Sequence, residues 1–194
     1  MLFLPAFLTL LGSVSAVDIW LNFQTTNCRG SGSVLCPGLE PNTCCSVPGR
    51  TGNPYTSVTV MHIPSVWNLD CRGHAGNYCG PIRELQTSNG RNTVCLGRGP
   101  FGGGGYGFWN GRVAATAESA AEGNCTRPSI VSLGDGTQYD VADLNDDDFN
   151  EMILLLTSSF HSFDIVEADG ISDDVPEKFN INKLDEASLL PRYY

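Results

Sequence analysis

Cysteine placement constrains this chain more than any other feature. All eight cysteines of the 194-residue sequence fall between Cys28 and Cys125, after an apolar N-terminal stretch. An even number of cysteines in an exported module indicates a disulfide framework rather than a metal site or a catalytic thiol. Cys44 and Cys45 are neighbours and are expected to take separate, distant partners, because a disulfide needs more distance between its Cα atoms. The pairing stays open. The predicted disulfide residues are Cys28, Cys36, Cys44, Cys45, Cys71, Cys79, Cys95 and Cys125.

The N-terminal stretch predicts export. Residues 1–16 are apolar and uncharged, and Val14 and Ala16 occupy the small-residue positions of a signal-peptidase site, so we expect cleavage after Ala16. A membrane anchor needs about 20 apolar residues, and Asp18 follows this shorter run. We therefore predict a secreted, extracellular protein without stable membrane insertion. The sequon Asn124-Cys125-Thr126 adds a predicted glycosylation site at Asn124.

Charge divides the chain in two. Residues 1–127 carry eight Arg and six acidic residues, whereas residues 128–194 carry three basic and fifteen acidic residues. The net charge of −10 argues against a nucleic-acid partner, since phosphate binding depends on clustered cations. The predicted organisation is a signal peptide at 1–16, a cysteine-rich β domain at 17–127, a hairpin–helix appendage at 128–163 and an acidic, partly disordered tail at 164–194.

Short strands dominate the prediction for the cysteine-rich part. Its expected strands are residues 55–63, 66–69, 84–87 and 93–96, which are rich in β-branched residues or alternate apolar with polar residues. Asn89-Gly90 lies between the last two, and this pair favours a tight hairpin turn. The glycines at 102–105 are expected either to let strands approach closely or to form a mobile loop.

The acidic part changes from a strand pattern to a helical one. Residues 130–133 and 137–141 flank a Gly-Asp-Gly turn and predict a second hairpin. Asn145 is placed to cap a following helix. Its apolar stripe is Phe149, Met152, Ile153, Leu156 and Phe160, and we expect it to dock on the β module. The arginines available for this acidic part or for another anionic partner are Arg72, Arg83, Arg91, Arg98 and Arg112. The fold class predicted is mainly β (α+β): a disulfide-stapled antiparallel Greek-key module with a C-terminal acidic hairpin and helix.

Two segments of the β module resemble the βγ-crystallin Greek-key motif. The first is Ser57-Val58-Thr59-Val60 followed by residues 67–76, and the second is residues 93–103 with Phe101 at its hairpin. The resemblance implies one Greek-key domain over roughly residues 28–125. The cysteine density is similar to that of small secreted proteins of filamentous fungi, a class that contains toxins and effectors.

The same resemblance implies two calcium loops. Family members that bind calcium use a loop of Asn or Asp with Ser or Thr, a pattern matched in part by Asn53, Thr56 and Ser57 and by Asn89 and Thr93. Calcium prefers charged oxygen ligands, and neither loop has a carboxylate. The alternative is that Thr56 and Ser57 only satisfy backbone groups of a turn. No other cofactor is predicted.

Catalytic motifs are missing from the sequence. His62, His74 and His161 are the three imidazoles, and Asp70 stands four residues before His74, but no serine elbow accompanies this pair. The Gly97–Gly102 segment matches a dinucleotide fingerprint but leads into further glycines instead of a helix. We therefore assign no catalytic residue and expect a non-enzymatic binding protein, effector- or toxin-like, acting on an extracellular protein or polysaccharide. The alternative is a small secreted hydrolase with an unrecognised carboxylate site.

Overall fold

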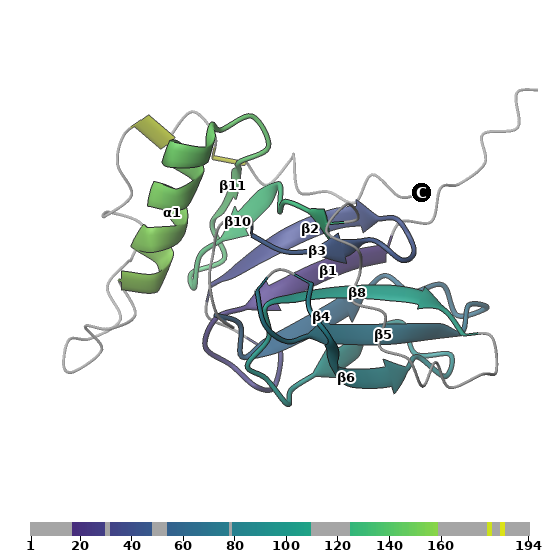
Figure 1. The fold of residues 1–194 in the computed structure, drawn as a ribbon. Helices are drawn as coiled ribbons and strands as arrows, with labels where there is room; N and C mark the ends of the chain where they lie inside the picture. The colour runs from purple at the N-terminus through teal and green to yellow at the C-terminus, as the bar shows by residue number, and fades with distance from the viewer. Residues whose placement is uncertain are drawn as a thin grey trace, which may run out of the picture.

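The computed structural model describes residues 17–29, 32–47, 54–77, 79–109, 125–158, 178–179 and 183–184. Within them the protein is mainly β, with two sheets, one α-helix and three disulfides (Figure 1). This confirms the prediction of a disulfide-stapled β module. Several predicted features lie outside the described residues: the signal peptide at 1–16, Asn53, Arg112, Asn124, Phe160, His161 and most of the acidic tail.

Sheet A has six strands, and every neighbouring pair is antiparallel. The strands follow the order β11-β10-β2-β1-β4-β7. Their bounds are β1 (Val17–Asn22), β2 (Ser33–Leu39), β4 (Ser57–Met61), β7 (Val94–Leu96), β10 (Ile130–Ser132) and β11 (Gln138–Asp140). β1 and β2 lie outside the predicted strands. Because β10 pairs with β2, the acidic half of the chain extends the sheet of the cysteine-rich half.

Sheet B has five strands in the order β6-β5-β8-β3-β9. Their bounds are β3 (Cys44–Cys45), β5 (Leu69–His74), β6 (Ile82–Thr87), β8 (Gly103–Phe108) and β9 (Cys125–Thr126). β9 runs parallel to β3, and the other neighbours are antiparallel. β4 and β7 are neighbours in sheet A although β5 and β6 come between them in the sequence, a non-local connection of the kind found in Greek-key folds.

One hydrophobic core lies between the sheets, and glycines allow it to be thin. Gly103, Gly104 and Gly105 are buried on β8. A Cβ atom on Gly104 would stand 2.5 Å from Val58 Cγ1 on β4, so sheet B approaches sheet A to a distance that only glycine permits here. Of the two predicted roles for this glycine run, close strand approach is confirmed and a mobile loop is wrong.

The Asn89-Gly90 turn forms, but it does not close a hairpin. Both residues have positive φ, 49° and 75°, and the Arg91 N–H donates to the Ser88 carbonyl at 3.0 Å. β6 then stays in sheet B while β7 joins sheet A beside β4. The predicted hairpin is therefore wrong. The reason is burial: Val94 and Leu96 of β7 complete the apolar row of β4, which a pairing with half-exposed β6 would not offer.

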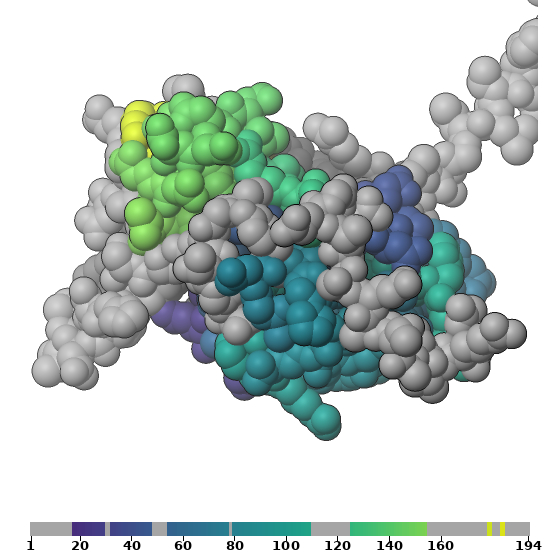
Figure 2. Space-filling model, in the orientation of Figure 1, coloured from purple at the N-terminus to yellow at the C-terminus, as the bar shows by residue number. Residues whose placement is uncertain are grey.

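The described part of the acidic half, from β10 to α1, packs in the same core as the β module. β10 and β11 form the expected hairpin, and α1 (Asp146–Ser158) lies beside it at one end of the molecule (Figures 1 and 2). Phe149, Met152 and Ile153 are buried in the same core cluster as the sheet residues. The side chain of Asn145 caps the helix by accepting the Asp148 N–H at 3.0 Å. No helix in the described part of the chain is long and apolar enough to span a membrane.

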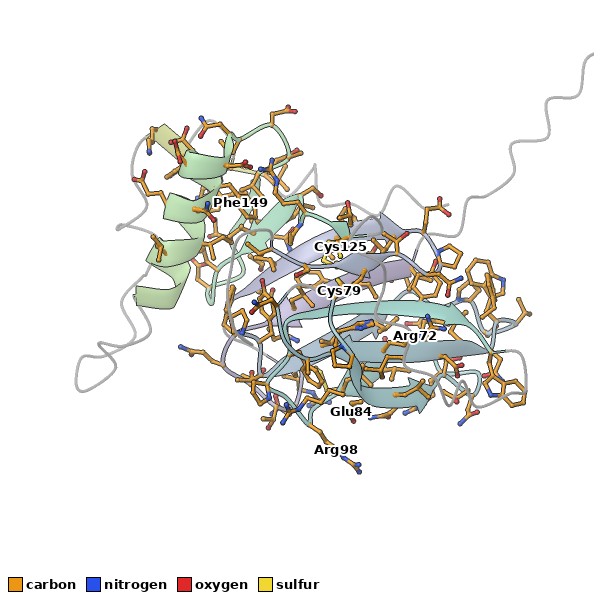
Figure 3. The ribbon with its side chains drawn as sticks, viewed as in Figure 1. Arg72, Cys79, Glu84, Arg98, Cys125 and Phe149 are labelled. Atoms are coloured by element: carbon orange, nitrogen blue, oxygen red, sulfur yellow. A yellow bond between two sulfur atoms is a disulfide. The ribbon has the colours of Figure 1, made fainter. Side chains whose placement is uncertain are left out.

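Arg127 fixes the N-terminus of α1, although it was not among the arginines predicted to meet the acidic part. Its guanidinium donates to the carbonyls of Ala142 and Leu144 at 2.9 and 2.8 Å and lies 4.7 Å from the ring centre of Phe149. It also forms an ion pair with Asp146 at 3.0 Å. Figure 3 shows Phe149 between the helix and the β10–β11 region. One planar cation therefore ties the segment between β9 and β10 to the β11–α1 loop and to the helix.

Candidate functional site

A hollow of about 320 Å³ lies on the outer face of sheet A, the face turned away from sheet B. The strands contribute Trp20, Asn22, Ser33, Thr59, Met61 and Ser132, and the adjoining loops contribute Cys28, Gly32, Leu133, Gly134 and Gly136. None of these described residues is charged, although the protein carries a net charge of −10. The hollow therefore suits an uncharged ligand that offers both polar and apolar surface.

Strand alternation places these side chains on the outer face. In β1, Val17, Ile19 and Leu21 are completely buried in the core, so the residues between them point to the opposite face. Trp20 and Asn22 are two of these outward residues. In β4 the same alternation sends Val58 and Val60 inward and Thr59 outward, directly opposite Trp20.

The floor of the hollow is a hydrogen-bonded set of small polar side chains. The amide Nδ2 of Asn22 donates to Ser57 Oγ at 3.1 Å and to Thr59 Oγ1 at 3.0 Å. Ser57 in turn donates its hydroxyl to the Thr25 carbonyl. Asn22, Ser57 and Thr59 are all buried, so their positions are fixed before any ligand arrives.

Among the described residues that line the hollow, Trp20 alone has a buried side-chain polar atom without a hydrogen-bond partner. Its indole Nε1 is buried and has no hydrogen-bond acceptor among the described residues. Leaving a buried donor without a partner costs about 1–3 kcal/mol. Such a group in a native protein calls for a water or ligand acceptor, and here it belongs to the largest side chain of the hollow.

An Asp–His pair stands at one end of the same face. Asp18 Oδ2 lies 2.7 Å from His62 Nδ1, and Asp18 Oδ1 accepts the Gly38 N–H at 2.8 Å. The Asp18 side chain is 9% exposed and that of His62 is 51% exposed. His62 also has φ 60°, a left-handed conformation that non-glycine residues adopt rarely and mostly where the surroundings enforce it. The fold thus holds the imidazole at the surface beside Met61, which lines the hollow.

The sequence could not reveal this pair, since 44 residues separate its members. The one available signal was the alternation of β1, which puts Asp18, Trp20 and Asn22 on one face. That signal predicts a polar row with a central tryptophan. It does not identify His62, which reaches Asp18 only because β4 pairs with β1.

The pair considered from the sequence, Asp70 and His74, does not form. Both residues lie on β5, where four positions span about 13 Å. His74 Nδ1 lies 2.7 Å from the Gly80 carbonyl and donates to it, while Asp70 accepts from the Thr87 hydroxyl at 3.4 Å. Burial lowers the pKa of His74, which keeps the ring neutral and structural. A spacing of four residues brings side chains together on a helix but not on a strand.

The predicted calcium loops lie at opposite ends of the β4–β7 pair. Thr56 and Ser57 precede Val58, which pairs with Leu96, whereas Thr93 precedes Val94 at the other end of the ladder. The Thr56 and Ser57 hydroxyls donate to main-chain carbonyls, as the alternative interpretation expected. Asn89 occupies the turn after β6, and within the described ranges no group of three or more acidic, His or Cys side chains is arranged to hold a metal ion. Calcium binding stays a prediction.

The described arginines of the cysteine-rich part do not converge on a common site. Arg72 donates to the Asn42 side chain, and Arg83 and Arg91 donate to main-chain carbonyls. Arg98 extends away from the sheet (Figure 3), and its backbone N–H is held by the buried carboxylate of Glu84. These contacts are those of a surface that stabilises its own loops.

Three disulfides join six of the cysteines that the structure describes. The three bonds are Cys28–Cys95, Cys36–Cys45 and Cys44–Cys79. Cys44 and Cys45 take separate partners, 35 and 9 residues away, which confirms that the neighbours do not bridge each other. The first bond ties the loop after β1 to β7, and the other two gather around β3, so both sheets are stapled.

Cys71 contradicts the prediction that every cysteine is oxidised. It is a free, fully buried thiol on β5, and burial raises its pKa to about 12. Cys125 lies on β9 beside Cys44, near Cys79 in Figure 3, and its predicted disulfide stays a prediction. Cys71 and Cys125 do not bridge each other, because β8 and β3 separate their strands by roughly 14 Å, about twice the limit for a disulfide. Cys71 is instead an apolar core residue.

A family model described as ARB_05566_N, N-terminal domain, matches residues 18–129. The matched segment runs from Asp18, the second residue of β1, to the residue before β10 and includes Trp20, Asn22, His62 and all eight cysteines. No curated protein and no solved structure matches the chain, and the resemblance to βγ-crystallins stays a prediction. Since the model covers more than half of the sequence, this chain belongs to the ARB_05566_N N-terminal domain family.

Proposed function

We propose that the protein is a secreted, non-enzymatic binding protein and that the hollow on the outer face of sheet A is its ligand site. Three disulfides within a small β module support an oxidising, extracellular location, because such bonds persist there and are rare in the cytosol. The apolar sequence before Val17 supports the same route. The proposed role is effector- or toxin-like, with an extracellular partner as the target.

The observation that carries the proposal is the buried Nε1 of Trp20, which lacks an acceptor among the described residues while its side chain lines an uncharged hollow. Ligand sites are concave and mostly apolar, with a few polar groups that fix orientation. Trp20, Met61 and Leu133 supply apolar surface, and the fixed Asn22–Thr59 set supplies the polar groups. This composition fits recognition of a neutral molecule.

The Asp18–His62 pair favours the second candidate, a secreted hydrolase. A carboxylate that orients an imidazole is one half of a general-base system. No hydrogen bond joins His62 to a Ser, Thr or Cys side chain within the described ranges, so a nucleophile is not supplied by this geometry. Binding is therefore the better-supported function. Hydrolysis of chromogenic ester or glycoside substrates that is lost in His62→Asn would favour the hydrolase instead.

The binding proposal is tested on the mature, oxidised protein labelled with ¹⁵N at its tryptophans. Trp20→Phe assigns the indole resonance of Trp20, and the probes are neutral monosaccharides, polyols and blocked dipeptide amides. We expect at least one probe class to shift the Trp20 resonance while those of Trp67 and Trp109 stay in place. Trp109→Phe, which changes an exposed tryptophan after β8, is the matched control and should leave the response intact. A Trp20 resonance that no probe class moves contradicts the proposal.

A further inference from the structure

We infer that the ligand of this hollow is a neutral, linear carbohydrate that lies along β1, an inference that rests on the proposed binding function. Three outward residues of β1 form the row it follows: Asp18 with its partner His62, then Trp20, then Asn22. Trp20 and Asn22 line the hollow itself, and the Asp18–His62 pair stands beyond it, next to Met61. Consecutive members of the row stand about 6.6 Å apart and the whole row spans about 13 Å. The cross-strand neighbours of the last two members, Thr59 and Ser33, add hydroxyl groups on both sides.

The chemistry of the row matches a sugar chain at each position. A pyranose ring has an apolar C–H face and a rim of hydroxyls that both donate and accept. An aromatic side chain with a polar edge meets both requirements, and Trp20 has a buried Nε1–H in need of an acceptor. Hydroxyl and amide side chains likewise pair with hydroxyls in either direction, and Asn22, Thr59 and Ser33 are of these types.

Other ligand classes fit less well. An anion requires cations, and no Lys or Arg lines the described hollow. A lipid chain would bring no acceptor to the buried Nε1 of Trp20, and a buried donor without a partner costs free energy. An extended peptide binds best by adding a strand to a sheet edge, whereas this hollow lies on the face of four central strands. The edge strand β11 is also already bridged by Lys183.

His62 terminates the row and makes a length preference testable. Both Asp18 oxygens are engaged, one by the Gly38 N–H and one by His62, so the exposed imidazole is the group that meets the ligand at this end. A row of about 13 Å is longer than a single sugar ring, so a longer chain can contact Trp20 and His62 at once. Affinity is therefore expected to increase from monosaccharide to trisaccharide and then to level off.

The experiment measures affinity by calorimetry for neutral oligosaccharides of one to five units, from glucan and chitin series, against the mature protein. A charged oligogalacturonate series is the control and should not bind. Trp20→Ala should weaken the trisaccharide by about tenfold or more, as expected for a central tryptophan anchor. Trp20→Phe keeps an aromatic ring but removes the Nε1–H, so its loss should be smaller.

His62→Asn tests the end of the row separately. Asn tolerates the left-handed backbone of this position but its side chain is shorter than the imidazole. The variant should weaken the trisaccharide several-fold toward the affinity of the shorter sugars and leave the monosaccharide unchanged. A far-ultraviolet spectrum and an unfolding midpoint equal to those of the parent protein establish that each variant is folded.

The outcomes separate the two proposals. Blocked dipeptides that shift the Trp20 resonance while no neutral saccharide binds would overturn the carbohydrate inference and leave the binding function standing. If neither class perturbs Trp20, both proposals fail. Saccharide binding that survives Trp20→Ala and shifts Trp67 and Trp109 would place the site at the surface around Trp67, Phe108 and Trp109 instead and overturn the inference for β1.

Discussion

Gly104 offers a stringent test of how closely the two sheets pack. A Cβ atom at this position would lie 2.5 Å from Val58 Cγ1 and 3.3 Å from both Ile19 Cγ2 and Leu21 Cδ2. The first distance is shorter than any stable carbon–carbon contact, and all three neighbours are fully buried in the core. Gly104→Ala is therefore expected to destabilise the fold, because the core has no room to move aside.

The magnitude follows from the atoms involved. Overpacking a core costs roughly 1–3 kcal/mol of unfolding free energy. Alanine also lowers the entropy of the unfolded chain, and this offsets about 0.4–1 kcal/mol of that cost. The expected net cost of Gly104→Ala is therefore about 1.5 kcal/mol. Val58→Ala removes two methyl groups at about 0.8 kcal/mol each, or roughly 2 kcal/mol with its cavity. In the double variant the new Cβ replaces the lost Cγ1, so only about one methyl group, about 1 kcal/mol, is missing.

The assay is equilibrium unfolding in denaturant with the disulfides intact, applied to both single variants and the double variant. Additive effects would total about 3.5 kcal/mol, so the expected double-variant cost of about 1 kcal/mol gives a coupling energy of about 2.5 kcal/mol. Gly76→Ala is the control: a Cβ there meets no atom within 4 Å, but φ is 79°, so its cost is backbone strain that Val58→Ala does not relieve. Additive costs for Gly104→Ala and Val58→Ala would refute the close approach of the sheets.

Four further predictions concern the thiol, the helix anchor, the staples and the buried imidazole. Cys71, with a pKa raised to about 12 by burial, should resist iodoacetamide at pH 8 in the folded protein and react once denaturant is added without reductant; rapid labelling of the native protein would contradict its burial. Because the pKa is raised in the folded state, the contribution of this thiol to stability is complete below the ordinary value of 9.0 and is lost as pH rises through about 12. Arg127→Lys should destabilise the packing of α1 by about 1–2 kcal/mol, because one ammonium group cannot reproduce the several hydrogen bonds of the planar guanidinium. The measurement is hydrogen exchange, which should become faster in residues 125–158 and stay unchanged in β1; equal exchange in both proteins would show that the apolar stripe alone holds the helix. Replacing Cys28 and Cys95 by Ala should cost about 4 kcal/mol, against about 2.5 kcal/mol for the bond between β2 and β3, because the first closes a much longer loop; thermal unfolding of the two variants compares them, and the reverse order would contradict an entropic origin. Burial lowers the pKa of His74, so folding favours its neutral form; stability is complete above the ordinary pKa of 6.5 and falls as pH drops below it. His74→Gln should flatten this decline in unfolding free energy between pH 7 and 5, and an unchanged slope would assign the decline to other groups.

Local sequence patterns predicted the elements whose stability is local. The β10–β11 hairpin follows from its Gly-Asp-Gly turn, where the Asp135 side chain accepts the Thr137 N–H at 2.7 Å. The helix follows from its apolar spacing and from the Asn145 cap. In these cases the residues that decide the conformation lie within a few positions of one another, so no distant contact is needed to recognise them.

Pairings between distant strands were beyond the reach of such patterns. The turn at Asn89-Gly90 was predicted correctly, but the strand after it joins β4 rather than its sequence neighbour. The same limit applies to the site: alternation in β1 puts Trp20 and Asn22 on one face, yet only the register of β1 with β4 brings Thr59 and His62 to them. Side chains four residues apart on a strand, such as Asp70 and His74, are correspondingly kept apart.

The sequence by itself determined a mainly β, cysteine-rich chain with local turns and a helix cap, and an acidic half that forms an amphipathic helix in its described part. The tertiary structure alone decided which cysteines pair, that the glycines of β8 form a core strand, and that Cys71 stays a buried thiol. The physical reason is that turns and caps are fixed by contacts between sequence neighbours, whereas disulfide geometry, sheet spacing and the polar row around Trp20 depend on strand register across the whole chain.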